Sequence, residues 1–319
     1  MMSFLDVRDL KMYYSTLKGD VKAVDGVNLE VGKGEAIGLV GESGCGKTTF
    51  ALAIMRLLPW NGRVVGGEVL FDGVNLIGLD DKRFDEDYRW KRLSYVFQGA
   101  MNALNPVFRV GDQIAEAITL HEDVEKEAAL DRARDLFKLV GIDPARVSSY
   151  PHELSGGMKQ RAMIAMALAC NPDFILADEP TTALDVIVQA QTLQVMNRLR
   201  KELGLTMMLI THDLSVVAQT CITCAIMYAG KIVEYADIES VFANPLHPYT
   251  QALTSAFPSI KEERRELHSI RGAPPNLLNP PTGCRFNPRC PYSMKICTEE
   301  EPEYKDQGGR HYVACHLLK

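Results

Sequence analysis

The segment Gly41-Glu42-Ser43-Gly44-Cys45-Gly46-Lys47-Thr48 decides how this chain of 319 residues folds. It follows the apolar run 36–40 and precedes a stretch of helical character, 47–58, which stops at Pro59. A glycine-rich loop between a buried strand and a helix turns backbone N–H groups inward, toward phosphate oxygens, at the positive end of the helix. This context predicts a phosphate-binding loop in an α/β fold, rather than a chance glycine turn.

The loop and the first turn of its helix are expected to hold a nucleotide. Lys47 is expected to contact the β- and γ-phosphates of ATP, and the Thr48 hydroxyl to bind Mg²⁺. The nucleotide-binding residues predicted here are Gly41, Glu42, Ser43, Gly44, Cys45, Gly46, Lys47, Thr48 and Thr49. Cys45 stands at a variable position of the motif, so its thiol is expected to be incidental to the chemistry.

Periodic patterns predict the surrounding elements. Apolar and polar residues alternate over 4–10 and 23–31, which indicates strands, and 62–79 carries another short β pattern. Helical periodicity runs through 125–170, and an apolar stripe with helical spacing extends from Ile187 to Leu203. The chain therefore alternates strands with helices.

Two further apolar runs, 174–178 and 206–211, predict buried strands and thus a mostly parallel sheet covered on both faces. Asp178 and Glu179 end the first of these strands, at the edge where an open parallel sheet binds its ligands. Asp178 is predicted to hold Mg²⁺, and Glu179 to act as the general base for an attacking water. The alternative is a solvated acidic turn.

Composition narrows the class of protein. With 46% hydrophobic residues the chain can bury a sizeable core, and its net charge of −6 argues against nucleic acid as the main partner. The N-terminus lacks the pattern of a secretory signal. The longest apolar runs, such as 164–170 and 207–210, fall far short of the roughly 20 residues that cross a bilayer. We therefore expect a soluble chain that can lie beneath a membrane protein.

A second anion-binding surface is predicted at Leu154-Ser155-Gly156-Gly157-Met158-Lys159-Gln160. Ser155 is a favourable N-cap for the helix-forming run 158–169. The backbone N–H groups of Gly156 and Gly157 then lie at the positive end of that helix. One chain needs only one phosphate cradle per nucleotide. The segment is therefore either a helix cap without a ligand or half of a site that another chain completes.

In this order and context, the motifs resemble those of the ATP-binding-cassette (ABC) ATPases over roughly residues 4–250. The resemblance implies a P-loop NTPase with a RecA-like parallel sheet core and an antiparallel β subdomain. It also implies a helical subdomain at about 99–170, all within a nucleotide-binding domain of residues 1–258. Two such cassettes pair head-to-tail with ATP between them, so Ser155, Gly156 and Gly157 would bind the nucleotide of the partner.

The resemblance assigns further residues to the site. Gln98 matches the Q-loop, which contacts Mg²⁺ and the attacking water, and Asp185 matches the D-loop at the dimer interface. His212 matches the switch histidine that contacts the γ-phosphate. Tyr14 is the aromatic residue predicted to stack on adenine, with Tyr13 as its nearest competitor. The predicted catalytic residues are Glu179, His212 and Gln98, and the predicted magnesium ligands are Thr48, Gln98 and Asp178.

The segment Asn244-Pro245-Leu246-His247-Pro248-Tyr249-Thr250-Gln251-Ala252-Leu253 resembles the N-P-x-H-P-Y-T segment of oligopeptide, dipeptide and nickel importer ATPases. Stretches 70–73 and 98–106 resemble the same branch, except that Gly99 stands where an acidic residue is common. On its own, the segment indicates only a helix start or turn at Pro248. The implied protein is a peripheral ATPase subunit on the cytoplasmic face of the membrane, coupled to its transporter through a cleft near 98–106.

The implied partners are a second ABC ATPase, related or identical, two integral membrane permease subunits and an extracytoplasmic peptide-binding protein. Nickel or another small solute is an alternative cargo, because the other subunits select it. A soluble ABC protein of translation or DNA repair is the alternative from another class. Such proteins commonly carry two cassettes, a coiled-coil insertion or a basic surface, and this sequence shows none of these.

An appended module is expected over 259–319, because composition changes near residue 258. It contains four cysteines, Cys284, Cys290, Cys297 and Cys315. Four thiols close together in a reducing compartment suggest a metal. The spacing lacks paired C-x-x-C knuckles and does not match the familiar ferredoxin runs, so it leaves iron–sulfur, zinc and free thiols open.

The segment 284–291 resembles the C-terminal extension of dipeptide-importer ATPases, which implies a [4Fe–4S] cluster on the four cysteines. His311 and His316 are alternative ligands. Cys221 and Cys224 form a separate C-x-x-C inside the cassette, and these two are expected to pack in the core because buried Cys behaves as a small hydrophobic residue.

Overall fold

The structure is a computed structural model that describes residues 3–99, 103–255, 270 and 272–318. The chain forms two compact units. The first comprises Met1–Val31, Ile37–Ile77 and Thr211–Lys319, and the second comprises Gly32–Ala36 and Gly78–Ile210. The domain boundary expected after residue 258, and residues 100–102 of the stretch 98–106, lie outside the described residues.

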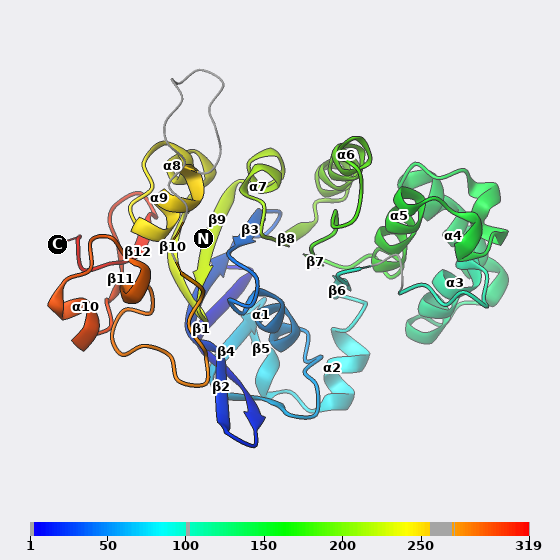
Figure 1. Cartoon of the computed structure of the whole chain (residues 1–319). Helices are drawn as coiled ribbons and strands as arrows, with labels where there is room; N and C mark the ends of the chain where they lie inside the picture. The colour runs from blue at the N-terminus through cyan, green and yellow to red at the C-terminus, as the bar shows by residue number, and fades with distance from the viewer. Residues whose placement is uncertain (1–2, 100–102, 256–269, 271, 319) are drawn as a thin grey trace. The chain divides into compact units, whose positions relative to one another are not determined.

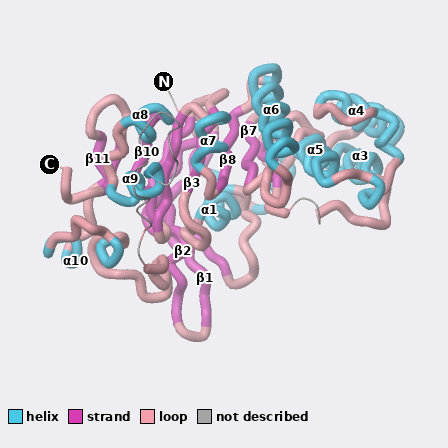
Figure 2. Tube along the Cα trace, turned by 45° about the horizontal axis from the view of Figure 1, so that its top comes forward, coloured by secondary structure: helices cyan, strands magenta, loops and turns pink. Residues whose placement is uncertain are grey.

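The first unit contains a four-stranded antiparallel sheet. Its strands are β1 (Leu5–Thr16), β2 (Gly19–Val31), β4 (Gly62–Phe71) and β5 (Val74–Asn75), in the order β2-β1-β4-β5. β1 and β2 form a long hairpin (Figure 2). In its register, Leu5 lies opposite Val31. Leu10 and Met12, two residues apart and so on one face of β1, are fully buried. The alternation in the sequence therefore predicted these strands, although β1 ends six residues later, at Thr16, and β2 begins four residues earlier, at Gly19, than expected.

The strand before the phosphate loop, β3 (Ala36–Val40), pairs in parallel with β9 (Thr223–Tyr228). β9 pairs antiparallel with β10 (Lys231–Asp237). β12 (Tyr312–Ala314) and β11 (Tyr304–Asp306), which come from the C-terminal residues, add two antiparallel strands beyond β10 (Figure 1). The end of the chain thus extends the sheet that carries the phosphate loop.

Short helices complete the first unit. They are α1 (Lys47–Ile54), α7 (Leu214–Thr220), α8 (Ile238–Ala243), α9 (Pro248–Ser255) and α10 (Lys295–Glu299). α7 lies against β3, because a Cβ added to Gly38 would stand only 2.2 Å from Cγ1 of Val217. Asp213 and Asp237 cap α7 and α8 by accepting hydrogen bonds from backbone N–H groups of the first helical turn.

The second unit contains three parallel strands. β6 (Leu93–Val96) pairs with β7 (Phe174–Asp178), and β7 with β8 (Thr206–Thr211). Every residue of these three strands is buried, as the apolar runs predict for β7 and β8. α6 (Val186–Leu203) connects β7 to β8 and ends at Gly204, whose φ is 65°. α2 (Asp81–Asp87) precedes β6 and is capped by Asp80.

Three helices of the second unit occupy the region predicted to be a helical subdomain. They are α3 (Val110–His121), α4 (Lys126–Leu139) and α5 (Gly156–Ala167), and short 3-10 turns at Pro144–Ser148 and Pro151–Glu153 connect the last two. No helix among the described residues is both long enough and apolar enough to span a membrane.

One local prediction was wrong at its end, and another gave the helix but not the extent of its burial. The helix after the phosphate loop was expected to reach residue 58, but it ends at Ile54, because Arg56 adopts the left-handed conformation with φ 52°. The apolar stripe of α6 is buried at Leu193, Met196 and Leu199, whereas Ile187 and Leu203 at its ends are exposed. Spacing alone does not show where a helix leaves the core.

Candidate nucleotide-binding site

The phosphate loop requires glycine at both ends. A Cβ on Gly41 would lie 2.1 Å from the carbonyl oxygen of Met227, so no side chain fits there. Gly46 has a φ of 110°, and a Cβ added there would lie 2.2 Å from the carbonyl oxygen of Ala23. β2 and β9 therefore fix both ends of the loop, while Ser43 and Gly44 at its tip are exposed.

Lys47 lies inside the loop rather than in solvent. It is 6% exposed, and its Nζ donates to the carbonyl oxygens of Gly41 at 2.7 Å and of Glu42 at 3.1 Å. Thr48 is exposed at the start of α1, where its hydroxyl can reach a ligand. Cys45 is buried, and burial raises the pKa of its thiol, which agrees with the expectation that it takes no part in the chemistry.

The structure distinguishes the two tyrosines proposed for the adenine. The hydroxyl of Tyr14 lies 3.1 Å from Oγ1 of Thr49, directly after the phosphate loop. Tyr13 instead donates to Asp25 at 2.6 Å, and burial together with this bond raises the pKa of Tyr13 to about 12. Of the two side chains, that of Tyr14 is therefore the one beside the loop.

Asp178 ends β7 as a buried carboxylate. It is 1% exposed, and its Oδ2 accepts a hydrogen bond of 2.8 Å from the hydroxyl of Tyr95 on β6. Burial, then the charge of Asp178, raises the pKa of Tyr95, so this hydroxyl remains a donor. A buried carboxylate oriented by a fixed donor is a suitable oxygen ligand for Mg²⁺.

Glu179 and Gln98 are brought together by the second unit. Nε2 of Gln98 donates to Oε2 of Glu179 at 2.9 Å, and the hydroxyl of Thr182 donates to the same oxygen at 2.9 Å. The backbone of Glu179 adopts a φ of 45°, which is uncommon for a residue with a side chain, while its N–H donates to the carbonyl oxygen of Ile210. The carboxylate is thus oriented by both its backbone and its neighbours.

The predicted second anion-binding segment forms the start of α5. Oγ of Ser155 accepts a hydrogen bond of 3.3 Å from the backbone N–H of Met158, which confirms Ser155 as the N-cap. The structure also shows why residue 157 is a glycine, which the sequence did not indicate. A Cβ there would lie 2.4 Å from Cγ1 of Val188 on α6. Asp185 caps α6 by accepting from the N–H groups of Ile187 and Val188.

His212 directly follows β8 and is exposed. The next residue, Asp213, caps α7, and its backbone N–H donates to Oγ1 of Thr211 at 3.0 Å. The predicted residues therefore fall in both units. Tyr14, the phosphate loop and His212 belong to the first, whereas Gln98, Ser155, Gly156, Gly157, Asp178, Glu179 and Asp185 belong to the second.

Comparisons with known proteins identify the family. Residues 24–182 match the family described as ABC transporter, and residues 233–297 match the oligopeptide/dipeptide transporter C-terminal region. A probable peptide ABC transporter ATP-binding protein of Sinorhizobium fredii is 48% identical, over 98% of this chain and 94% of its own length. The oligopeptide transport ATP-binding protein OppD of Bacillus subtilis is 46% identical, over 98% of this chain and 88% of its own.

The chain belongs to the ABC transporter ATP-binding proteins of the oligopeptide/dipeptide family. A solved dimeric post-hydrolysis state of an ATP-binding cassette, bound to ADP and phosphate, has a TM-score of 0.66 and 28% identity. The matched region covers 73% of this chain and 98% of the solved cassette. The predictions of an α/β ABC cassette and of an ATPase are confirmed.

In this ABC subunit, the His-Pro-Tyr segment (residues 247–249) makes contacts that its sequence did not indicate. His247 is buried, its N–H donates to Glu234, and its Nδ1 accepts from the N–H of Tyr249 at 3.0 Å. The hydroxyl of Tyr249 accepts a hydrogen bond of 3.0 Å from the backbone N–H of Glu42 in the phosphate loop. Arg289 donates to the carboxylate of the same Glu42.

The cysteines of this ABC subunit follow two patterns. Cys221 and Cys224 are buried in the core, as predicted. The pKa of Cys284 is raised to about 11, chiefly by burial and to a smaller extent by the charges of the other three C-terminal cysteines. However, in the part of the chain that the structure describes, no group of three or more His, Cys, Asp or Glu side chains is arranged to hold a metal ion.

Proposed function

We propose that this ABC subunit hydrolyses ATP to energise the uptake of dipeptides or oligopeptides across the cytoplasmic membrane. The carrying observation is the similarity, over nearly the whole chain, to ATP-binding proteins named for peptide and oligopeptide transport. The match of residues 233–297 to the C-terminal region of oligopeptide/dipeptide transporters supports the same cargo. Nickel is the alternative cargo, and the transport assay described below distinguishes the two.

The second unit supplies the groups that would act on water. Glu179 would accept the proton of the attacking water, and this role is supported by its carboxylate, which is held by Gln98 and Thr182 and remains only half-buried. The amide of Gln98 would orient that water. His212, exposed at the end of β8, would contact the γ-phosphate.

The donor set proposed for Mg²⁺ consists of oxygen atoms, which this cation prefers. Asp178 offers a buried carboxylate, and Thr48 and Gln98 offer an exposed hydroxyl and an exposed amide oxygen. When bound, Mg²⁺ neutralises charge on the β- and γ-phosphates. Lys47 would add its positive charge to that of Mg²⁺, because its ammonium group already lies inside the loop.

We infer that a second cassette completes the site. The N-terminus of α5, capped by Ser155, presents backbone N–H groups that would bind phosphate. The phosphate loop of the same chain already supplies one such set for its own nucleotide, so this second set would serve the nucleotide of a partner. Beside Asp185, the side chains of Val186 and Ile187 are 81% and 71% exposed, which is costly in water and suits an interface. The second cassette is either an identical copy or a related subunit.

The membrane permeases are proposed to dock on the helical part of the second unit. A cavity of about 530 Å³ lies there, lined by Phe108 and by residues of α3 such as Asp112 and Glu116. Phe108 and the preceding residue, Val107, are exposed and directly follow the stretch predicted to couple the subunits. An extracytoplasmic peptide-binding protein would deliver cargo to these permeases, and the ATPase would be peripheral on the cytoplasmic face.

Reconstitution tests this function. The subunit is assembled in proteoliposomes with two integral membrane permease subunits and a second ABC ATPase, and loaded binding protein is added. Peptide-stimulated hydrolysis together with uptake of labelled dipeptide is the expected result. Uptake of nickel without peptide uptake would assign the other cargo, and normal hydrolysis with no membrane partner would contradict the importer.

We also propose that Cys284, Cys290, Cys297 and Cys315 hold a [4Fe–4S] cluster. Two points support the proposal: the charges of the other three thiols act on Cys284, and the N–H of Cys284 donates a hydrogen bond of 2.9 Å to the carbonyl oxygen of Cys297. The donors are four thiols, the set that such clusters use. Zinc is the alternative.

A further inference from the structure

Glu42, the second residue of the phosphate loop, is held by two contacts from the C-terminal part of the chain. Its backbone N–H donates to the hydroxyl of Tyr249 at 3.0 Å. Its carboxylate receives both arms of the Arg289 guanidinium, at 2.6 Å to Oε2 and 3.0 Å to Oε1. Main chain and side chain of the same residue are thus fixed together, and a bidentate pair fixes orientation as well as distance.

Arg289 is itself held in place. Its side chain is 6% exposed, whereas that of Glu42 is 26% exposed, so the pair is largely shielded from solvent. The guanidinium lies over the ring of Tyr228, 5.7 Å from its centre, and donates to the hydroxyl of that tyrosine at 3.3 Å. Arg289 also lies in the 3-10 turn Asn287–Arg289, directly before Cys290.

Tyr249 belongs to the same packed group. Its ring lies 4.7 Å from that of Tyr228 and 5.4 Å from that of Phe286, measured between ring centres. Both Tyr249 and Phe286 are fully buried. Phe286 comes from the C-terminal residues and Tyr249 from the His-Pro-Tyr segment, so both regions support one rigid aromatic cluster under the loop.

We propose that Arg289 and Tyr249 are positioning residues for the phosphate loop, which act through Glu42 and thereby set the affinity of this subunit for ATP. This inference rests on the proposed nucleotide site. The physical reason lies in charge and order. Glu42 is an anion in a loop that must bind the polyphosphate, and Arg289 neutralises it and turns it aside. Tyr249 holds the start of the loop in place, so the loop loses less conformational entropy when a nucleotide binds.

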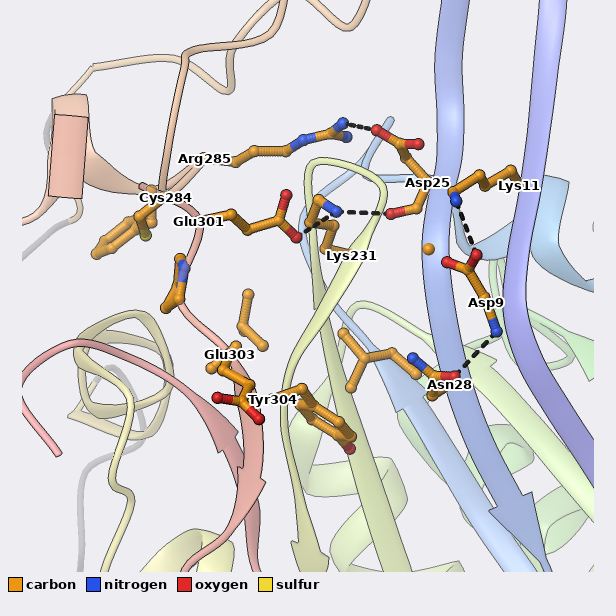
Figure 3. A pocket seen from close by; sticks show the side chains of 16 residues that line it. Asp9, Lys11, Asp25, Asn28, Lys231, Cys284, Arg285, Glu301, Glu303 and Tyr304 are labelled. Carbon is orange, nitrogen blue, oxygen red and sulfur yellow. Dashed lines mark hydrogen bonds and ion pairs between the residues drawn. The ribbon is translucent and has the colours of Figure 1, made fainter. Parts of the chain in front are cut away.

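The same region offers a matched control. A cavity of about 540 Å³ lies between β1, β2 and β10 and the C-terminal residues (Figure 3). At this cavity Lys231 pairs with Glu301 at 2.5 Å, an ion pair that also ties the C-terminal residues to the sheet (Figure 3). Neither Lys231 nor Glu301 makes any of these contacts with Glu42, so Glu301→Gln tests whether loosening the C-terminal residues is by itself sufficient.

The test is a titration of the full chain with fluorescent MANT-ATP and Mg²⁺. Arg289→Ala is expected to raise the Kd about tenfold, Arg289→Lys about threefold and Tyr249→Phe about threefold, while Glu301→Gln leaves it unchanged. In the Glu42→Gln background, Arg289→Ala is expected to change the Kd less than about twofold, because no anion is left to neutralise. Thermal unfolding of every variant is measured in parallel.

Different failures have different meanings. Equal Kd values for the native chain and Arg289→Ala overturn the inference. An equal loss from Arg289→Ala in the native and in the Glu42→Gln background also overturns it, because that result assigns Arg289 a structural role only. Where Arg289→Ala does not fold, Arg289→Lys and Tyr249→Phe decide by the same comparison. A folded native chain that binds MANT-ATP no better than Lys47→Ala overturns the proposed nucleotide site instead.

Discussion

The side-chain amide of Gln98 donates a hydrogen bond of 2.9 Å to the carboxylate of Glu179. Gln98 follows β6 and Glu179 follows β7, two neighbouring parallel strands that end at the same edge of their sheet. The bond therefore links the residue proposed to take a proton from water with the residue proposed to orient that water. The register of β6 and β7, in which Val96 lies opposite Ala177, sets their distance.

Glu179→Gln is expected to bind ATP normally and to lose hydrolysis at least about 100-fold, because an amide cannot accept the proton of the attacking water. Gln is nearly the same size, and it can still accept hydrogen bonds from Gln98 and Thr182. Single-turnover hydrolysis and nucleotide binding are measured in the assembled transporter. Glu202→Gln, an exposed change on α6, is the control, and near-normal turnover of Glu179→Gln would remove Glu179 from the base role.

Tyr14→Ala is expected to weaken ATP binding about threefold to tenfold, because stacking of an aromatic ring contributes ~0.5–1.5 kcal/mol. Tyr14→Phe keeps the ring and loses only the contact with Thr49, so it is expected to bind ATP nearly as well as the native chain. The same titration with GTP measures how far binding depends on the nucleotide base, adenine or guanine. Tyr13→Phe serves as the control, and if it weakened binding more than Tyr14→Ala, the adenine contact would belong to Tyr13.

Several elements of the site could be predicted from local sequence. The strands β3, β7 and β8 begin and end where their apolar runs do, because only a buried strand accommodates such short continuous runs beside glycine or acidic residues. Ser155 and its helix followed from capping chemistry alone. These features depend on residues that are close in the chain, so a local pattern is sufficient to find them.

Other contacts had no local signal. Arg289 and Glu42 are separated by 247 positions, and nothing near either residue indicates the other. The His-Pro-Tyr segment suggested only a helix start at Pro248, whereas its Tyr249 contacts the phosphate loop. Such pairs depend on how β9, α9 and the C-terminal turns pack together. Sequence periodicity describes a single element and therefore cannot supply them.

Gly157→Ala is expected to destabilise the subunit by about 1–3 kcal/mol, because the new methyl group would overlap Cγ1 of Val188 on α6. Urea unfolding of the isolated chain measures the change. Val188→Ala removes the obstructing atoms, so the double variant Gly157→Ala/Val188→Ala is expected to be more stable than Gly157→Ala. If the second substitution failed to rescue the first, the close approach of α5 and α6 would not be the cause.

His247 is expected to make stability fall with acid. Burial lowers the pKa of His247 to about 3, whereas an unfolded histidine has a pKa of about 6.5. Between these values the unfolded chain binds a proton that the native chain does not. The free energy of unfolding therefore decreases by up to ~1.4 kcal/mol per pH unit as the pH falls below about 6.5, and this contribution levels off near 3.

Urea unfolding at pH 7, 6 and 5 measures the contribution of His247. His247→Asn keeps an acceptor for the N–H of Tyr249 but does not titrate, so its stability is expected to depend less steeply on pH. Glu234, which accepts from the N–H of His247, is unchanged in both proteins. Parallel pH profiles for the native chain and the variant would assign the acid sensitivity to other groups.

Anaerobically purified protein is expected to contain iron and acid-labile sulfide, and Cys290→Ser is expected to lose both. Burial and the charges of neighbouring cysteines raise the pKa of Cys290 and Cys315, so thiolates form there at a cost that a positively charged metal core offsets. Cys221→Ala removes a buried thiol outside this group and is expected to retain the iron. Stoichiometric zinc without iron would replace the cluster with a zinc site, and four titratable thiols with no metal would leave the cysteines as packing residues.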